Sequence, residues 1–195
     1  MQCVRRKGFT LVELLIVIGI IGLLIGIMTP VLSRAKRVAQ RTMCATNLRQ
    51  IGVAVRAYLN DSNDVFFYFG VTNMPSLAPE APTFRGILED CGAADPKVYK
   101  CPADKPRNLQ EERPAPNTGK SYFESEGSSY QFQDHPGILG HKVQEVAKRI
   151  SSRGDRVLAE NQIWLVKDWQ GFHGTPGEKN AANYLYSDGH VTDLE

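Results

Sequence analysis

Residues 9–28 read FTLVELLIVIGIIGLLIGIM, twenty positions that carry one charged side chain, Glu13. A helix rises about 1.5 Å per residue, so this segment is long enough for the roughly 30 Å hydrocarbon core of a bilayer. The sequence therefore predicts that the segment is a helix that crosses a membrane.

A secretory signal peptide is the main alternative, because the basic residues Arg5, Arg6 and Lys7 precede the apolar segment. The apolar part of a signal peptide usually has about 7 to 15 residues, fewer than are present here. Beyond the segment only Ser33-Arg34-Ala35 offers a cleavage site, and a weak one. A membrane-spanning anchor is the favoured interpretation. Basic residues flank both of its ends, so charge counting does not give its orientation.

Glu13 is the most informative residue of the segment, because a carboxylate in lipid costs about 3 kcal/mol on insertion scales. A functional role with a nearby partner is the first expectation, and the alternative is that Glu13 reaches the membrane interface. A free amine would be a suitable partner. Cleavage after Gly8 would create one on Phe9, about one helical turn away, and the amine of a neighbouring subunit could serve equally.

Beyond the apolar segment we expect the helix to continue through residues 30–62 with one apolar face. Pro30 should kink it or melt it locally. The apolar side chains that recur at helical spacing are Val31, Ala35, Val38, Ala45, Leu48, Ile51, Val55, Tyr58 and Leu59. Residues 60–64 favour turns and end the pattern. From Phe9 to Leu59 the helix would be about 75 Å long.

Residues 5–29, RRKGFTLVELLIVIGIIGLLIGIMT, closely resemble the signature of type IV pilins and type II secretion pseudopilins. The shared features are a basic leader, a glycine, a phenylalanine and then TLVELL. The resemblance implies that a prepilin peptidase cuts between Gly8 and Phe9 and methylates the new N-terminus. It also implies that Glu13 is needed for assembly and that Pro30 occupies the family's kink position.

The same resemblance supplies a location and partners. Residues 1–8 would be a cytoplasmic leader, residues 9–29 the single span of a bacterial inner membrane and the core of a filament, and residues 63–195 a periplasmic head. The implied partners are prepilin peptidase, other pilin-like subunits, the inner-membrane assembly platform and membrane lipid. The assembled filament would lie in the periplasm or at the cell surface.

A second resemblance covers more of the chain. The runs CATNLRQIGVAVRAYLND, KCPAD, VLAE and NYLYSDGHV are similar to a bacterial subgroup of pilin-like proteins with a C-terminal His and Asp-Gly. In that subgroup nine residues separate the histidine from Asp-Gly. Here fourteen residues separate His173 from Asp188-Gly189, and an insertion such as TPGEK would account for the difference.

The head is expected to be α+β, a small antiparallel sheet packed on the exposed half of the long helix. Candidate strands are 65–69, 121–124, 129–132, 156–160, 163–169, 183–186 and 190–194, with a tight turn at Ser187-Asp188-Gly189. Residues 141–150 predict a short amphipathic helix, and residues 102–120 an irregular surface loop. Trp164, Trp169 and Phe172 are expected to cluster in the core.

The chain has four cysteines, with no pair spaced as in a zinc finger. Cys91 and Cys101 bracket a short loop and are a plausible disulfide if the head lies in an oxidising compartment. Two free buried thiols are the alternative. Cys44, on the long helix, would stay unpaired, and Cys3 would leave with the leader.

The sequence gives little sign of chemistry in the head. With 23 basic and 21 acidic side chains, composition does not indicate a nucleic-acid binder. His173, Asp188 and His190, with Asp193, could form a metal or acid/base cluster, but turn structure explains them more simply. No nucleophile elbow or phosphate-cradling loop is present. We therefore expect no enzyme and no cofactor, but a filament subunit; the alternative is a minor pilin that acts as an adhesion or DNA-uptake module.

Overall fold

The structure is a computed structural model that describes residues 10–68, 70–93, 95–106, 119–134, 138–151, 160–174, 179 and 181–192. Gly8, Phe9 and Asp193 lie outside the described residues. The chain divides into two compact units, Met1–Ala39 and Gln40–Glu195. Each unit is described by itself below.

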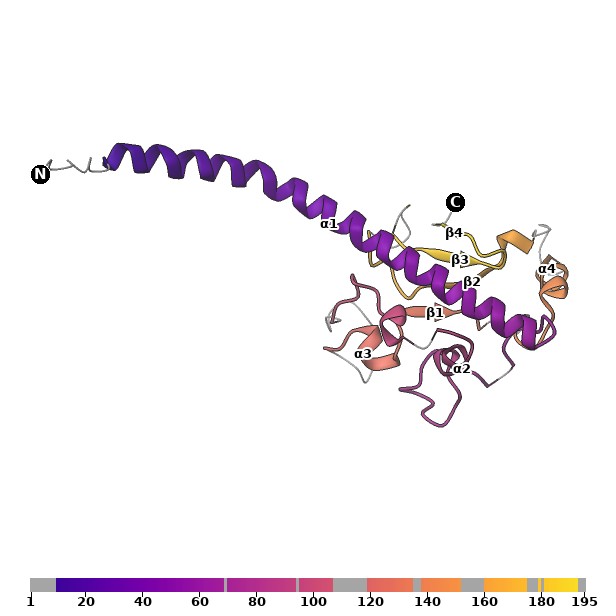
Figure 1. Ribbon diagram of the computed structural model, residues 1–195. Coiled ribbons are helices and arrows are strands. Elements are labelled where there is room, and N and C mark those ends of the chain that lie inside the picture. Colours follow the sequence, from indigo (N-terminus) through magenta and orange to yellow (C-terminus); the bar gives the residue numbers. More distant parts are fainter. Residues whose placement is uncertain are drawn as a thin grey trace, which may run out of the picture. The chain divides into compact units, whose positions relative to one another are not determined.

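The longest element is the helix α1, Leu11–Asp61, which Figure 1 shows as unbroken. Pro30 lies inside it, so the expected local melting at this residue is wrong. Two neighbouring hydroxyls bond to backbone carbonyls, Thr29 to Ile25 (2.8 Å) and Ser33 to Pro30 (2.9 Å). These bonds supply local polar contacts where proline removes a backbone donor. A kink at Pro30 stays a prediction.

In the first unit, every described residue from Thr10 to Ala39 is exposed. Leucine, isoleucine and valine side chains face all sides of this part of α1. By length and composition, α1 contains a segment that can cross a membrane. No described residue of the chain buries these apolar side chains.

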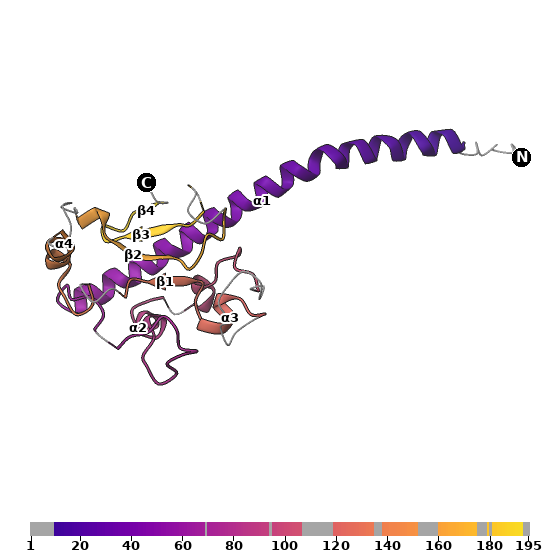
Figure 2. The ribbon, with the colours of Figure 1, turned by 180° about the vertical axis from the view of Figure 1, so that it is seen from behind.

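In the second unit, the rest of α1 has one buried face, whereas Val31, Ala35 and Val38 of the predicted apolar face lie in the first unit and are exposed. Its buried residues recur at helical spacing: Cys44, Leu48, Ile51, Gly52, Ala54, Val55 and Leu59. This face packs against one side of a sheet, which both Figure 1 and Figure 2 show alongside the C-terminal half of α1. The core of the head lies between the two.

The sheet has four antiparallel strands in sequence order: β1 Tyr130–Phe132, β2 Trp164–Asp168, β3 Tyr184–Tyr186 and β4 Val191–Thr192. Tyr130 pairs with Asp168, and Lys167 pairs with Tyr184. Gly189 has a φ of 91°, the left-handed conformation that the β3–β4 turn needs. The α+β fold and this tight turn are confirmed.

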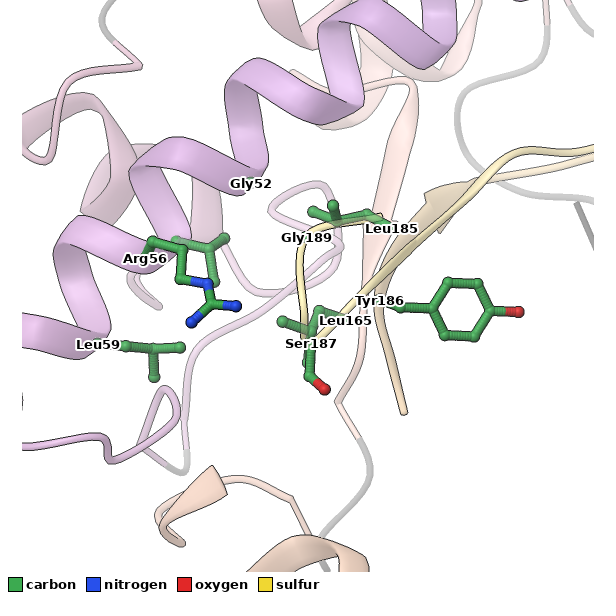
Figure 3. Close-up of a pocket in the computed structure, with 9 residues that line it drawn as sticks. Gly52, Arg56, Leu59, Leu165, Leu185, Tyr186, Ser187 and Gly189 are labelled. Carbon is green, nitrogen blue, oxygen red and sulfur yellow. The ribbon is translucent and has the colours of Figure 1, made fainter. Parts of the chain in front are cut away.

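A close approach joins α1 to the β3–β4 hairpin, as Figure 3 shows. A Cβ atom at Gly52 would lie 3.0 Å from the Cδ1 atom of Leu185, so glycine allows this spacing. The remaining cavity between α1, β2 and the hairpin is about 10 Å³, room for one water at most. Leu185 faces the helix whereas the ring of Tyr186 points away from it.

Short helices fill the connections: α2 Phe84–Asp90, η1 Pro96–Tyr99, α3 Tyr122–Glu126, α4 Val143–Ser151 and η2 Glu160–Gln162. The helix predicted at 141–150 is confirmed as α4. The strand predicted at 121–124 is wrong, because Ser121 and Glu124 exchange hydrogen bonds as a capping box that begins α3. Of the predicted strand 65–69, residues 65–68 are described, and among these only Val65 makes a strand-like bridge, to Lys142.

The disulfide differs from the expected one. Cys44 bonds Cys101, with Cα atoms 5.3 Å apart, and Cys91 is free. The pairing of Cys91 with Cys101 and the unpaired state of Cys44 are therefore both wrong. Cys44 lies on the buried face of α1, where it meets Cys101, and both residues are fully buried. Cys91 sits at the half-buried end of α2.

The expected aromatic cluster is split in two. Trp169 and Phe172 both contact the Tyr122 ring, with centroids 5.0 and 6.1 Å away. Trp164 lies elsewhere on the sheet, 6.1 Å from the Tyr184 ring.

Candidate assembly site and a buried cluster in the head

The N-terminus of α1 is closed by a capping box formed by Thr10 and Glu13. A carboxylate oxygen of Glu13 accepts hydrogen bonds from the backbone N–H of Thr10 (2.9 Å) and from its hydroxyl (2.8 Å). In return, the Thr10 hydroxyl oxygen accepts from the Glu13 N–H at 3.3 Å. The carboxylate thus satisfies backbone donors that a helix start leaves free, and it lies at the positive end of the helix dipole.

The capping box holds the Glu13 carboxylate at the N-terminal end of α1, where the charge has no oppositely charged partner among the described residues. Its capping partners are neutral, and no ion pair to Glu13 occurs among the described residues. The side chains that follow, such as Leu14 and Leu15, are apolar and exposed. The carboxylate is therefore held in the first turn of the helix, four residues after Phe9 in sequence, with capacity for a cation from outside.

Two of the three metal candidates in the head lie together in the β3–β4 turn. The Nδ1 atom of His190 is 2.5 Å from Oδ1 of Asp188, the His190 backbone N–H donates to the same oxygen (3.0 Å), and the imidazole stacks on Tyr186. Burial works against the Asp188 charge, but these hydrogen bonds outweigh it and lower the pKa of Asp188. The arrangement is that of a turn, with both side chains 43% exposed.

The third candidate, His173, belongs to a different group. Its Nε2 atom lies 3.4 Å from Oδ2 of Asp168 and 3.6 Å from Sγ of Cys101. In the part of the chain that the structure describes, the cluster of metal-binding side chains comprises Cys44, Cys101, Asp168 and His173, so His173 does not join Asp188 and His190. The alternative considered from the sequence, one cluster of His173, Asp188 and His190, is therefore wrong in its membership.

The buried group is held by backbone and side-chain contacts. Oδ2 of Asp168 accepts from the backbone N–H (2.7 Å) and the side-chain amide (3.1 Å) of Asn183. The His173 backbone N–H donates to the Ala181 carbonyl (3.0 Å). Burial, and then the charge of Asp168, raise the pKa of the nearby Tyr130, which therefore stays protonated. The Tyr130 oxygen accepts from the Asn47 amide of α1 at 3.2 Å.

Sequence reasoning missed three participants in these sites. Thr10 was detectable, since Thr-x-x-Glu before an apolar run is a capping-box pattern. Asp168 reads as an ordinary polar residue at the end of a strand, and only the pairing of β2 with β1 and β3 brings it to the histidine. To predict the pairing of Cys44, one must know which face of α1 turns toward the rest of the head. The spacing of cysteines along the chain does not give this face.

Two comparisons with known proteins bear on these sites. Residues 3–29 match the family described as the prokaryotic N-terminal methylation motif. Over 102 residues the chain is 30% identical to the type IV major pilin protein PilA of Myxococcus xanthus (strain DK1622). This alignment covers 52% of the present chain and 44%, less than half, of PilA. Both findings support the type IV pilin and pseudopilin family. No solved structure matches the chain.

Proposed function

We propose that this chain is a structural subunit of a type IV pilus-like filament, a pilus or a secretion pseudopilus. The observation that carries the proposal is the first part of α1. From Leu11 to Met28 it is exposed and apolar on all sides apart from its one carboxylate, Glu13, which is fixed at the helix start. The match to the methylation motif covers this same segment.

The exposed apolar side chains need an environment that the chain itself does not provide. Exposed patches of this extent mark membrane or protein contacts rather than a water-facing surface. We infer two successive environments, the inner-membrane bilayer before assembly and the equivalent helices of neighbouring subunits afterwards. The helix is long enough for the first and uniformly apolar enough for the second.

Processing by prepilin peptidase would prepare the assembly contact. Cleavage after Gly8 leaves a positively charged amine on Phe9, and N-methylation preserves that charge. We propose that this amine pairs with Glu13 of the adjoining subunit at the assembly platform. The pairing offsets the cost of placing the carboxylate among apolar groups and sets the register between helices. The head would then lie on the periplasmic side, and the subunit would act without catalysis.

Processing is tested by intact-mass measurement and N-terminal sequencing of protein extracted from membranes. We expect a chain that begins at Phe9 and carries the mass of one added methyl group. A chain that still begins at Met1, or one cut near Ala35, would contradict the proposal.

The assembly contact is tested with Glu13→Gln, because glutamine can still form a capping box but carries no charge. We expect normal membrane insertion and a normally folded head, but loss of incorporation into filaments of unmodified subunits. Glu145→Gln, on the exposed surface of α4, is the matched control and should be incorporated normally. Normal incorporation of Glu13→Gln would show that Glu13 serves the cap alone.

A further inference from the structure

We propose that the head, when Cys44 and Cys101 are reduced, binds a divalent thiolate-preferring metal ion of the zinc class. The ligands are the sulfur atoms of Cys44 and Cys101, a carboxylate oxygen of Asp168 and Nε2 of His173. One ligand atom from each of the four residues lies within 4.8 Å of the other three. They come from α1, from the loop after η1, from the end of β2 and from the loop that follows it.

The distances fit tetrahedral coordination. Zinc bonds of about 2.0 to 2.3 Å at tetrahedral angles place neighbouring ligand atoms about 3.3 to 3.8 Å apart. His173 Nε2 lies 3.4 Å from Asp168 Oδ2 and 3.6 Å from Cys101 Sγ. The imidazole and carboxylate therefore already have the required spacing. The two sulfur atoms are joined in the disulfide and must separate before both can bind a metal ion.

Burial gives the site a second reason to take up a cation. The side chains of His173 and Asp168 are 1% and 0% exposed. Asp168 Oδ1 and His173 Nδ1 are buried without a hydrogen-bond partner. With one oxygen unpaired, the charge of the buried Asp168 carboxylate is only partly compensated, and a cation bound through Oδ2 would compensate it. Asn183 orients the carboxylate through Oδ2, in the manner of outer-shell groups at metal sites.

The chemistry balances with a dithiol as reductant. The dithiol gives two electrons and two protons to the Cys44–Cys101 bond and becomes a disulfide itself, leaving two thiols on the chain. Binding of the divalent ion then releases both thiol protons to water. The occupied site contains two thiolates, one carboxylate and a neutral imidazole, a donor set that suits zinc.

Metal and disulfide exclude one another at this site, because both use the same two sulfur atoms. Every copy of the chain passes through the dithiol form before oxidation, since thiols stay reduced in the cytosol. The metal would thus occupy the head before the disulfide closes. It would also return if a periplasmic dithiol opened the bond.

The test uses the full chain in detergent, reduced without air by a phosphine and titrated with Co²⁺ as a visible probe. We expect one cobalt per chain, with the intense visible absorption of tetrahedral thiolate coordination, and its displacement by Zn²⁺. The oxidised chain should show no such absorption. This result is informative whether or not the reduced head is folded beforehand, because metal binding can drive folding. A reduced, unmodified chain without this absorption would overturn the proposal.

Variants locate the site. Cys101→Ser should abolish the cobalt absorption, and His173→Gln should lower the affinity by about tenfold or more, since even outer-shell losses have effects of this size. Cys91→Ser and His190→Gln are matched controls that remove a thiol and an imidazole outside the cluster, and both should leave binding unchanged. Loss of the absorption in Cys91→Ser with retention in Cys101→Ser would also overturn the assignment.

Discussion

The two parts of α1 have the same backbone and opposite surroundings. From Leu11 to Ala39 every residue is exposed, with Leu11 at 79% and even Val17 at 46%. From Cys44 to Leu59 one face is covered by the head, and Leu48 and Ile51 are 0% exposed. The first part makes local polar contacts, at Thr10 and around Pro30, whereas the second makes contacts to distant segments.

This difference shows where each part obtains its stability. In the second part, the apolar side chains are buried by the rest of the same chain, so they contribute to the free energy of unfolding of the head. In the first part, the described residues of the chain do not supply such burial, and under the proposed function it would come from lipid or from other subunits. Paired substitutions in the two parts should therefore have unequal effects on the unfolding of the isolated chain.

The largest expected effect comes from the bond that ties the second part to the head. In detergent, Cys44→Ala with Cys101→Ala should lower the free energy of unfolding of the head by about 4 kcal/mol, the loop entropy for a separation of 57 residues. Chemical denaturation followed by tryptophan fluorescence measures it, since both tryptophans lie in the head. Cys91→Ala is the control. A loss below about 1 kcal/mol would mean that the head holds this helix without the bond.

The next largest effect is a difference between two leucine-to-alanine substitutions, one in each part of α1. Leu48→Ala should lower the free energy of unfolding of the head by about 3 kcal/mol, through lost burial and a cavity. Leu24→Ala removes the same atoms from the exposed part and should leave that value unchanged in detergent. If both variants lowered the free energy of unfolding by the same amount, the proposed difference between the two parts of α1 would be wrong.

A smaller effect is expected for polar contacts. Asn47 donates from its side-chain amide to the Lys100 carbonyl (3.0 Å) and to the Tyr130 hydroxyl. Asn47→Ala should therefore cost the head about 1 to 2 kcal/mol in the same denaturation assay. Ser33→Ala, which loses one bond within the first part of α1, should have no effect on the head. A Ser33→Ala loss as large as that of Asn47→Ala would argue against the distinction.

The smallest effect concerns two glycines of α1. Gly52→Ala should cost about 1 kcal/mol net, because crowding against Leu185 exceeds the gain of roughly 0.5 to 1 kcal/mol from better helix propensity. Gly22→Ala meets no atom within 4 Å and should not destabilise the chain in detergent. Thermal unfolding of the two variants measures the difference. A stabilised Gly52→Ala would show that Leu185 moves aside at little cost.

Local patterns in the sequence were sufficient for much of the fold. The apolar run and the helical spacing after it predict α1, and Ser187-Asp188-Gly189 predicts the turn between β3 and β4. These features depend on neighbouring residues alone. The strand predicted at 121–124 failed although a local signal was present, since Ser-x-x-Glu marks a helix start as clearly as Thr-x-x-Glu does at Thr10.

The head sites depend on contacts between distant segments, which explains why they were not predictable. Cys101 has two possible partners, and the nearer one in sequence, Cys91, is not the one that it meets. The choice follows from which side of α1 is buried and from the position of the loop after η1. His173 and Asp168 are only five residues apart, but contacts to a more distant segment hold them, since Asn183 donates to Asp168 and the His173 N–H donates to Ala181.

The disulfide has a mechanical consequence. Cys44 is the first fully buried residue along α1, about one turn after Gln40, whose side-chain amide donates to the Pro102 carbonyl (3.0 Å), so the disulfide lies near the point where the helix begins its contact with the head. In the proposed filament, tension would pull on the helices, and a helix separates from its domain most easily from one end, where contacts break one at a time. A covalent bond at that end blocks the first step of peeling. The applied force would then be shared by all contacts between α1 and the rest of the head.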